Sequence, residues 1–223
     1  MLTILIGRAK TGKSDTMLRR MAELGESSQQ ILLVPEHASH QAEVDVCRAC
    51  GDTASRHAEV LSFRRLGERV LSITGGIADV TLDNGGKLLT LQRALLETAP
   101  QMTVYRKPSQ KVGFLEQMLA LFDELRSYEV TPEILYQQAQ DIDGATHDKL
   151  TDLSLLYAAY EARLRRPGLD ARDRMTKLCD HLEESGYVRG KDIFIDGFTC
   201  FNAQERRALR FSCGRPGLSR SRC

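Results

Sequence analysis

The feature that most restricts the fold of this sequence is an eight-residue loop motif close to the N-terminus. The apolar run Leu2–Ile6 is followed by the segment Gly-Arg-Ala-Lys-Thr-Gly-Lys-Ser at residues 7–14, and helical spacing of apolar residues begins directly after it. The GxxxxGKS pattern between a strand and a helix is typical of a phosphate-binding P-loop, because its glycines let the backbone curl around an anion and the helix N-terminus points free N–H groups at it. We therefore predict a strand, a phosphate-binding loop and a helix.

The motif also predicts roles for individual side chains. Lys13 carries the charge expected to reach the β- and γ-phosphates of ATP, and the Ser14 hydroxyl is placed to ligate Mg²⁺. In the alternative interpretation Gly7 and Gly12 are ordinary turn glycines, but the Lys-Ser pair would then have no explanation. We expect ATP and Mg²⁺ as cofactors, with the nucleotide held by Gly7, Arg8, Ala9, Lys10, Thr11, Gly12, Lys13 and Ser14.

A second acidic candidate lies far along the chain. The apolar run Ile193–Ile195 ends at Asp196, which has the form of a Walker B aspartate holding magnesium through water, although a plain strand-end aspartate would look the same. The next residue is Gly197, where DNA helicases carry the glutamate that acts as catalytic base. Hydrolysis is therefore a weaker expectation than binding, and Glu205 is either a substitute base or a solvated helix residue. Lys13 and Asp196 are the catalytic candidates.

Apolar periodicity indicates how the chain is organised. Short apolar runs at 31–34, about 58–63 and 192–196 predict further strands of a parallel sheet, whereas residues 83 to about 185 have long helical periodicity and no convincing strand. We predict an α/β fold, a helicase-like P-loop NTPase whose parallel sheet is interrupted by an all-helical insertion. The expected boundaries are 1–75 plus 187–210 for the ATP-binding domain, 76–186 for the insertion, and 211–223 for an atypical tail.

The tail interrupts the helix that begins near Ala203, because Arg, Ser, Gly and Cys replace the helical pattern there. It is interpreted as a truncated or frame-altered end of a longer protein, with a flexible basic tail that touches nucleic acid as the alternative.

Composition limits the class of protein. Apolar residues make up 42% and charged residues 27%, as in an ordinary globular chain, and the formal charge of +1 means that any DNA contact would need a local patch. No signal peptide and no stretch of about 18 apolar residues is found, so a cytoplasmic protein without a membrane anchor is expected. The six cysteines are scattered, as in reduced thiols; Cys47 and Cys50 are either helix-borne thiols or half of a metal or redox site.

Two polar segments follow predicted strands at the edge that carries the loop. Residues 34–43 could meet the backbone or bases of single-stranded DNA; His37 and His40 within them are metal ligands or, more simply, exposed histidines. Residues 62–65 combine a hydroxyl, an aromatic ring and two guanidinium groups, a set that could stack on a base and bind phosphate, although a helix start with surface arginines has the same pattern.

The predicted insertion contains residues for which a structural role is expected. Tyr157 and Tyr160 lie on a leucine-rich helical stripe and are predicted to be core residues rather than a base-stacking platform. Four acidic residues without EF-hand spacing are predicted to be solvated rather than metal-binding: Asp141, Asp143, Asp148 and Asp152.

With these residues in place, the chain resembles the N-terminal part of the AddB family, the B subunits of bacterial AddAB helicase-nucleases, whose N-terminal regions are similar to superfamily 1 DNA helicases. The resemblance extends to about Glu205. It is carried by residues 7–14, by 32–36 with 41–43, by 60–63 with 65–66, and by 193–198 with 201–205. Lys10 departs from the family pattern, where small residues are typical.

The resemblance implies an ATP-dependent helicase/deoxyribonuclease that processes double-strand DNA breaks for recombinational repair, acting on double-stranded ends and single-stranded DNA. It implies an AddA-like partner that supplies the main motor. Such B subunits are much longer, and their nuclease domain and 4Fe–4S cluster ligands would lie beyond this chain.

Two other functions remain open from the sequence. One is a small P-loop phosphotransferase, such as a nucleotide or metabolite kinase, with the helical insertion as a lid. The other is a binding module in which ATP is only structural.

Overall fold

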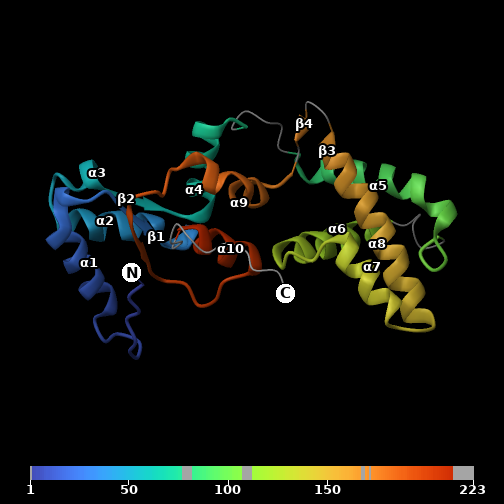
Figure 1. Cartoon of the computed structure of the whole chain (residues 1–223), viewed down its shortest axis with the longest axis horizontal. Coiled ribbons are helices and arrows are strands. Elements are labelled where there is room, and N and C mark those ends of the chain that lie inside the picture. Colours follow the sequence, from blue (N-terminus) through green and yellow to red (C-terminus); the bar gives the residue numbers. More distant parts are fainter. Residues whose placement is uncertain (1, 77–81, 107–111, 167–168, 171, 213–223) are drawn as a thin grey trace. The chain divides into compact units, whose positions relative to one another are not determined.

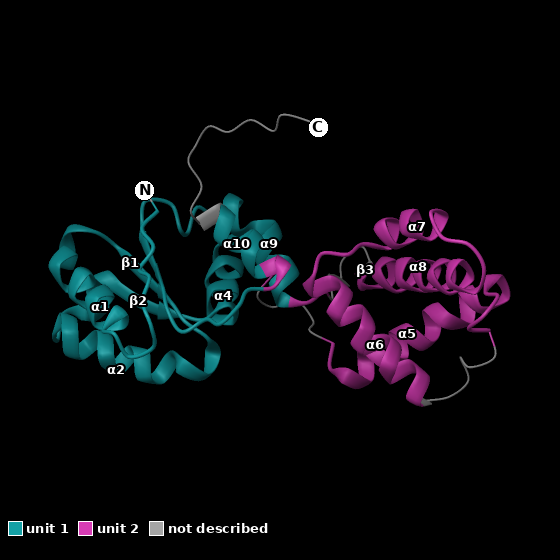
Figure 2. Cartoon of the chain, turned by 90° about the horizontal axis from the view of Figure 1, so that it is seen from below, with its two compact units in different colours: residues 1–75, 174–201, 205–223 teal, residues 76–173, 202–204 magenta. Residues whose placement is uncertain are grey.

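The computed structural model describes residues 2–76, 82–106, 112–166, 169–170 and 172–212. The chain divides into two compact units (Figure 2): unit 1 comprises residues 1–75, 174–201 and 205–223, and unit 2 comprises residues 76–173 and 202–204. Unit 1 is α/β and unit 2 is built mainly of helices. Residues 174–186, which the sequence pattern assigned to the helical insertion, belong to unit 1 instead.

Unit 1 contains a three-stranded parallel sheet (Figure 1). Its strands are β1 (Gln30–Leu33), β2 (Ala58–Leu61) and β5 (Asp192–Ile195), in the order β2-β1-β5. Every residue of β1 is buried, whereas the residues of β5 are only partly buried or exposed. These three strands and their parallel arrangement confirm the α/β prediction for this part of the chain.

Helices cover both faces of the sheet because side chains alternate along each strand. Leu32 and Val34 pack with α1 (Lys13–Leu24), α2 (Ser39–Cys50) and α3 (Ala54–His57). On the opposite face, Ile31 and Leu33 pack with helices that come from three separate parts of the sequence: α4 (Phe63–Thr74), α9 (Arg174–Ser185) and α10 (Ala203–Ser212). The apolar run of β1 is therefore buried from both sides, as parallel strands usually are.

The strand predicted at Leu2–Ile6 is absent. Residues 2–8 have no regular secondary structure, and Leu2, Ile4 and Ile6 are 72%, 70% and 93% exposed. Among the described strands, β5 pairs only with β1, and residues 2–6 do not pair with β5 or with any other strand. An apolar run becomes a strand only when a partner strand supplies its hydrogen bonds.

Unit 2 is a helical bundle with a short antiparallel ladder. A buried cluster of aromatic and leucine side chains joins its helices, and the Phe122 ring lies 4.7 Å from the Tyr157 ring and 5.9 Å from the Tyr160 ring. This confirms that both tyrosines are core residues. The elements are α5 (Asn84–Thr98), η3 (Ala99–Gln101), α6 (Val112–Ser127), α7 (Pro132–Gln140), α8 (Ala145–Leu164), β3 (Arg165–Arg166) and β4 (Leu169–Asp170).

Two elements of unit 2 differ from the sequence expectation. The ladder β3–β4 lies where no strand was expected; its two-residue strands are too short to give an apolar alternation. Helix α7 lies within the stretch predicted to be helical but was not identified as a separate helix, although its start carries a clear signal: the Thr131 hydroxyl accepts a hydrogen bond from the Ile134 N–H, and Pro132 occupies the first turn.

Asp152 is not the solvated side chain that its acidic neighbourhood suggested. It is 3% exposed, and its carboxylate accepts hydrogen bonds from the backbone N–H groups of Thr103, Val104 and Tyr105 at 3.0, 2.7 and 2.9 Å. A carboxylate that accepts hydrogen bonds from three N–H donors holds residues 103–105 against helix α8.

The predicted tail falls mostly outside the described residues. Helix α10 continues to Ser212, two residues beyond the expected end of the fold, and residues 213–223 are not described.

Candidate nucleotide-binding loop and sheet-edge site

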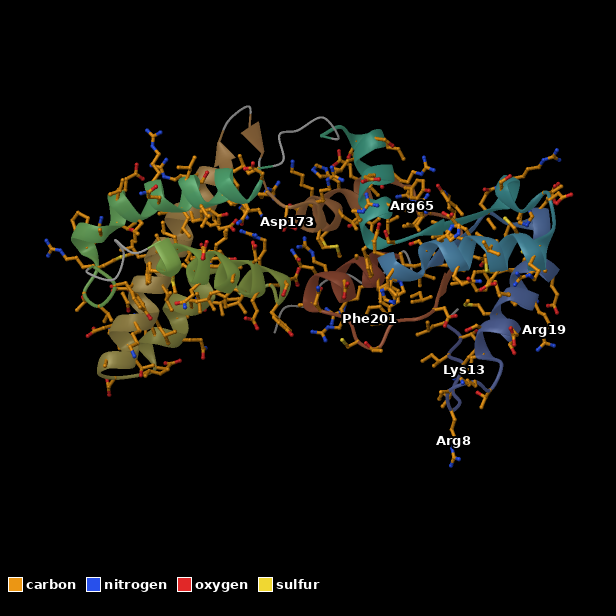
Figure 3. All side chains as sticks on the ribbon, turned by 180° about the vertical axis from the view of Figure 1, so that it is seen from behind. Arg8, Lys13, Arg19, Arg65, Asp173 and Phe201 are labelled. Atoms are coloured by element: carbon orange, nitrogen blue, oxygen red, sulfur yellow. The ribbon has the colours of Figure 1, made fainter. Side chains whose placement is uncertain are left out.

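The GxxxxGKS segment forms a tight loop that runs into the first turn of α1. The Lys13 ammonium donates hydrogen bonds to the carbonyl oxygens of Gly7 at 3.0 Å and Arg8 at 2.6 Å, so the loop closes around its own lysine. The Thr11 hydroxyl donates to the Arg8 carbonyl at 2.8 Å and tightens the same turn. Figure 3 shows Lys13 at the start of α1 and the Arg8 side chain pointing away from the rest of the unit.

Backbone conformation in the loop favours anion binding. Lys10 and Gly12 both have left-handed φ values, 60° and 77°, on either side of Thr11. Left-handed residues in a tight turn direct successive N–H groups into one concavity, which is the arrangement that binds anions in proteins. The helix start adds to it, because Gly12 at the N-cap has no side chain to satisfy the first N–H groups of α1.

The magnesium-ligand candidates occupy different elements. Ser14 is exposed on the first turn of α1, and Asp196 follows the last residue of β5, with its backbone N–H donating to the Leu33 carbonyl at 3.1 Å. Within the described residues, no hydrogen bond or ion pair connects the Ser14 hydroxyl or the Asp196 carboxylate to the other.

Gly197 has a structural reason to be glycine. Its φ is +79°, and a Cβ atom built there would lie 3.2 Å from the Cδ atom of Pro35. A residue with a side chain would therefore be strained by its own backbone and would press on the turn after β1. The sharp turn after Asp196 thus disfavours a glutamate at the position where helicases carry their base.

A cavity of about 420 Å³ lies where the carboxyl ends of the three strands meet. Loops that follow parallel strands gather at this edge, which is where open α/β sheets bind ligands. The lining residues come from the ends of β1, β2 and β5 and from α10: Val34, Pro35, Glu36, His37, Ser62, Phe63, Arg64, Gly197, Phe198, Thr199, Cys200 and Glu205.

A charged network crosses the cavity wall. Arg64 donates to Glu36 through Nε at 3.0 Å and to Glu68 through Nη1 at 2.8 Å, and the Ser62 hydroxyl donates to Glu36. The hydrogen bond from Arg64, followed by that from Ser62, lowers the pKa of Glu36 below its usual value. The predicted segments 34–43 and 62–65 are therefore brought together, and Arg65 extends the contact by pairing with Glu43.

Aromatic rings lie beside this network. The ring of Phe63 meets that of Phe198 at 5.6 Å in an edge-to-face arrangement, and Phe198 meets Phe201 at 4.8 Å. Phe63 belongs to a predicted segment, but the roles of Phe198, Thr199 and Cys200 in the cavity wall were missed. The available signal was their position, since they directly follow a strand that ends at the same edge as β1 and β2.

The other ligand candidates are placed as their simpler interpretations expected. His37 in η2 (Glu36–Ala38) and His40 in the first turn of α2 are both exposed, and Cys47 and Cys50 are helix-borne on α2. Burial, followed by the neighbouring Cys47, raises the pKa of the Cys50 thiol. No group of three or more His, Cys, Asp and Glu side chains arranged for a metal ion occurs in the described ranges.

Among the helices that the structure describes, none combines the length and the apolar character needed to cross a lipid bilayer.

The fold and this site define an α/β protein with a GxxxxGKS segment at the start of a helix. The family model described as "ADDB, N-terminal" matches residues 4–211, and the chain belongs to this family.

Three similar proteins are each named as the B subunit of an ATP-dependent helicase/deoxyribonuclease. The protein of Clostridioides difficile is 31% identical over 216 residues, covering 94% of this chain and 19% of its own length. Those of Desulforamulus reducens and Natranaerobius thermophilus are 38% and 33% identical over 213 residues, each covering 92% of this chain and 18% of their own length. These relatives are subunits of an enzyme complex, and the chain spans about a fifth of their length.

Proposed function

We propose that this chain is the ATP-binding region of the B subunit of an ATP-dependent helicase/deoxyribonuclease, and that it contributes to holding DNA. The observation that carries the proposal is the loop at residues 7–14, which combines two left-handed residues, a helix start without a side-chain cap and a lysine bonded to the loop's own carbonyl oxygens. These groups suit a polyphosphate, because backbone N–H donors, a helix N-terminus and a cation are the groups that bind phosphate in proteins.

Each loop residue has a defined part in this proposal. Lys13 would exchange its bonds to the carbonyls of Gly7 and Arg8 for bonds to phosphate oxygens. Ser14 offers an exposed hydroxyl as a hard oxygen ligand, and Asp196 would face the same site through water. Bound Mg²⁺ would neutralise part of the phosphate charge.

Binding, rather than rapid hydrolysis, is the proposed role of the nucleotide. General-base catalysis needs a carboxylate within reach of the attacking water, and position 197 carries none: it is a glycine whose left-handed φ and close approach to Pro35 disfavour a side chain. Glu205, the other candidate base, lies on α10 and lines the sheet-edge cavity, so it is not placed directly after Asp196 as the base of helicases is.

The sheet-edge cavity is proposed to hold single-stranded DNA. The partly buried ring of Phe198, which packs on the buried Phe63, would provide a surface for a base, and Arg64 would exchange its bonds to Glu36 and Glu68 for bonds to the phosphate backbone. In the relatives' setting this chain would act on broken double-stranded ends in recombinational repair, together with an AddA-like partner.

The test measures binding and hydrolysis of ATP by the purified chain, with and without single-stranded DNA and with and without Mg²⁺. Lys13→Ala is expected to abolish ATP binding, whereas Lys149→Ala, on the exposed surface of α8, serves as the matched control and should bind normally. Turnover should be slow or absent whatever the DNA. Rapid turnover that depends on a small acceptor and ignores DNA would contradict the proposal and favour a phosphotransferase.

A second measurement tests the DNA site by fluorescence anisotropy with a labelled single strand. Phe198→Ala is expected to weaken binding by about 1 to 3 kcal/mol, the value of one base–aromatic stack. Tyr136→Ala, an exposed aromatic on α7, is the control. Equal effects of both variants would show that the cavity is not the binding surface.

A further inference from the structure

Lys10 occupies a backbone position that suits glycine. Its φ of 60° lies in the left-handed region, and it shares this property with only one other non-glycine residue of the described chain, Glu129. A residue with a Cβ atom is disfavoured there, because the Cβ approaches the following carbonyl oxygen. The side chain of Lys10 therefore does not stabilise the backbone of the loop. A role for this lysine would have to come from its charge.

The surroundings of Lys10 differ from those of Lys13. The Lys13 ammonium is held by the carbonyls of Gly7 and Arg8, whereas the Lys10 side chain is exposed and has no hydrogen-bond or ion-pair partner within the described residues. The eight-residue loop contains Arg8, Lys10 and Lys13 and no acidic residue. Lys10 thus adds a second ammonium to the turn whose N–H groups form the proposed phosphate concavity.

We propose that Lys10 is a specificity-determining residue that makes the loop prefer nucleoside triphosphates over diphosphates. The inference rests on the proposed function, since it concerns the same phosphate site. A triphosphate carries one more negative charge than the diphosphate of the same nucleoside, so a cation added beside the phosphates stabilises the triphosphate complex more. An attraction between two unit charges about 8 Å apart raises an affinity about twofold at the dielectric constant of water. At the effective dielectric constant of a protein surface it raises the affinity about thirtyfold.

The experiment compares the affinities of the full chain for ATP and ADP in the presence of Mg²⁺, measured by calorimetry at about 0.05 M and 0.3 M salt. The variants are Lys10→Asn, which tolerates the left-handed conformation without a charge, Lys10→Gly, which removes the side chain, and Lys10→Arg, which keeps the charge. Lys149→Asn on α8 is the matched control. Circular dichroism checks that each variant is folded.

The expected result is a preference for ATP over ADP that falls about threefold or more in Lys10→Asn and Lys10→Gly and stays unchanged in Lys10→Arg and Lys149→Asn. The wild-type preference should shrink at the higher salt, because ions screen exposed charges.

The inference is overturned if the two neutral variants keep the wild-type ratio of ATP to ADP affinity, whether or not both affinities fall together. If that happens while Lys13→Ala binds neither nucleotide, the proposed function stands without this role for Lys10. If the wild-type chain itself binds neither nucleotide, the proposed function fails, and the inference fails with it.

Discussion

Replacing Gly197 by glutamate would put a carboxylate back directly after Asp196, and we expect it to destabilise unit 1 rather than to accelerate ATP hydrolysis. Two costs follow from the structure. The left-handed φ of +79° costs a residue with a side chain about 1 to 2 kcal/mol. The Cβ atom, 3.2 Å from Pro35 Cδ, also forces the turn after β1 to shift.

One effect acts in the opposite direction, because replacing glycine reduces the conformational entropy of the unfolded chain by about 0.4 to 1 kcal/mol. The backbone cost less this gain leaves a loss of up to about 1.6 kcal/mol, and the displacement of Pro35 adds to it, so we expect a net loss of about 1 kcal/mol or more in the free energy of unfolding.

Urea unfolding followed by far-UV circular dichroism measures this loss, with two alanine variants as controls. Gly197→Ala should lose nearly as much as the glutamate variant, because the strain arises at the backbone and Cβ. Gly190→Ala should lose less, because Gly190 has a similar φ of +75° but open space around its added Cβ. The reasoning is refuted if Gly197→Ala unfolds within about 0.5 kcal/mol of wild type, or if Gly197→Glu hydrolyses ATP faster than wild type.

Three further predictions concern stability. Asp152→Asn should lower the free energy of unfolding by about 2 to 4 kcal/mol, because backbone N–H donors lose a charged acceptor, whereas the exposed Asp143→Asn should change it by less than about 0.5 kcal/mol; urea titrations compare the two. Phe122→Ala should cost about 3 to 5 kcal/mol, since its ring is fully buried against Tyr157, and a change below about 1 kcal/mol would contradict this packing. The pKa of Glu36 lies below its usual 4.5, so the ionised carboxylate stabilises the fold above pH 4.5, and this stabilisation is lost as the pH falls through the lower folded-state pKa. Acid unfolding titrations should show that the free energy of unfolding falls less steeply below pH 4.5 in Glu36→Gln than in wild type.

The strands of unit 1 were predictable because buried parallel strands have continuous apolar sequences. The same pattern at Leu2–Ile6 gave a wrong prediction, since composition reports a tendency to be buried and does not report whether a neighbouring strand is present. Helix α7 could have been found from Thr131 and Pro132, whose types and positions indicate a helix start.

Contacts between distant parts of the sequence could not be predicted in the same way. Asp152 has its partners at residues 103–105, and a run of acidic residues carries no information about backbone donors so far away. The two polar segments that form the sheet edge were recognised separately, because each follows a strand. Their joining by Glu36 and Arg64 depends on the strand order, which places β1 and β2 side by side.

The late position of β5 in the sequence has a consequence for biosynthesis. Strands β1 and β2 leave the ribosome before β5, which is synthesised roughly 130 residues after β2, a delay on the order of 10 s. During this interval the nascent chain has an incomplete sheet, with one edge of β1 uncovered, while residues 76–173 emerge between the two halves of unit 1. The buried residues around Phe122 all lie within that intervening stretch. The helical unit is therefore able to fold on the ribosome before β5 is synthesised and completes the sheet.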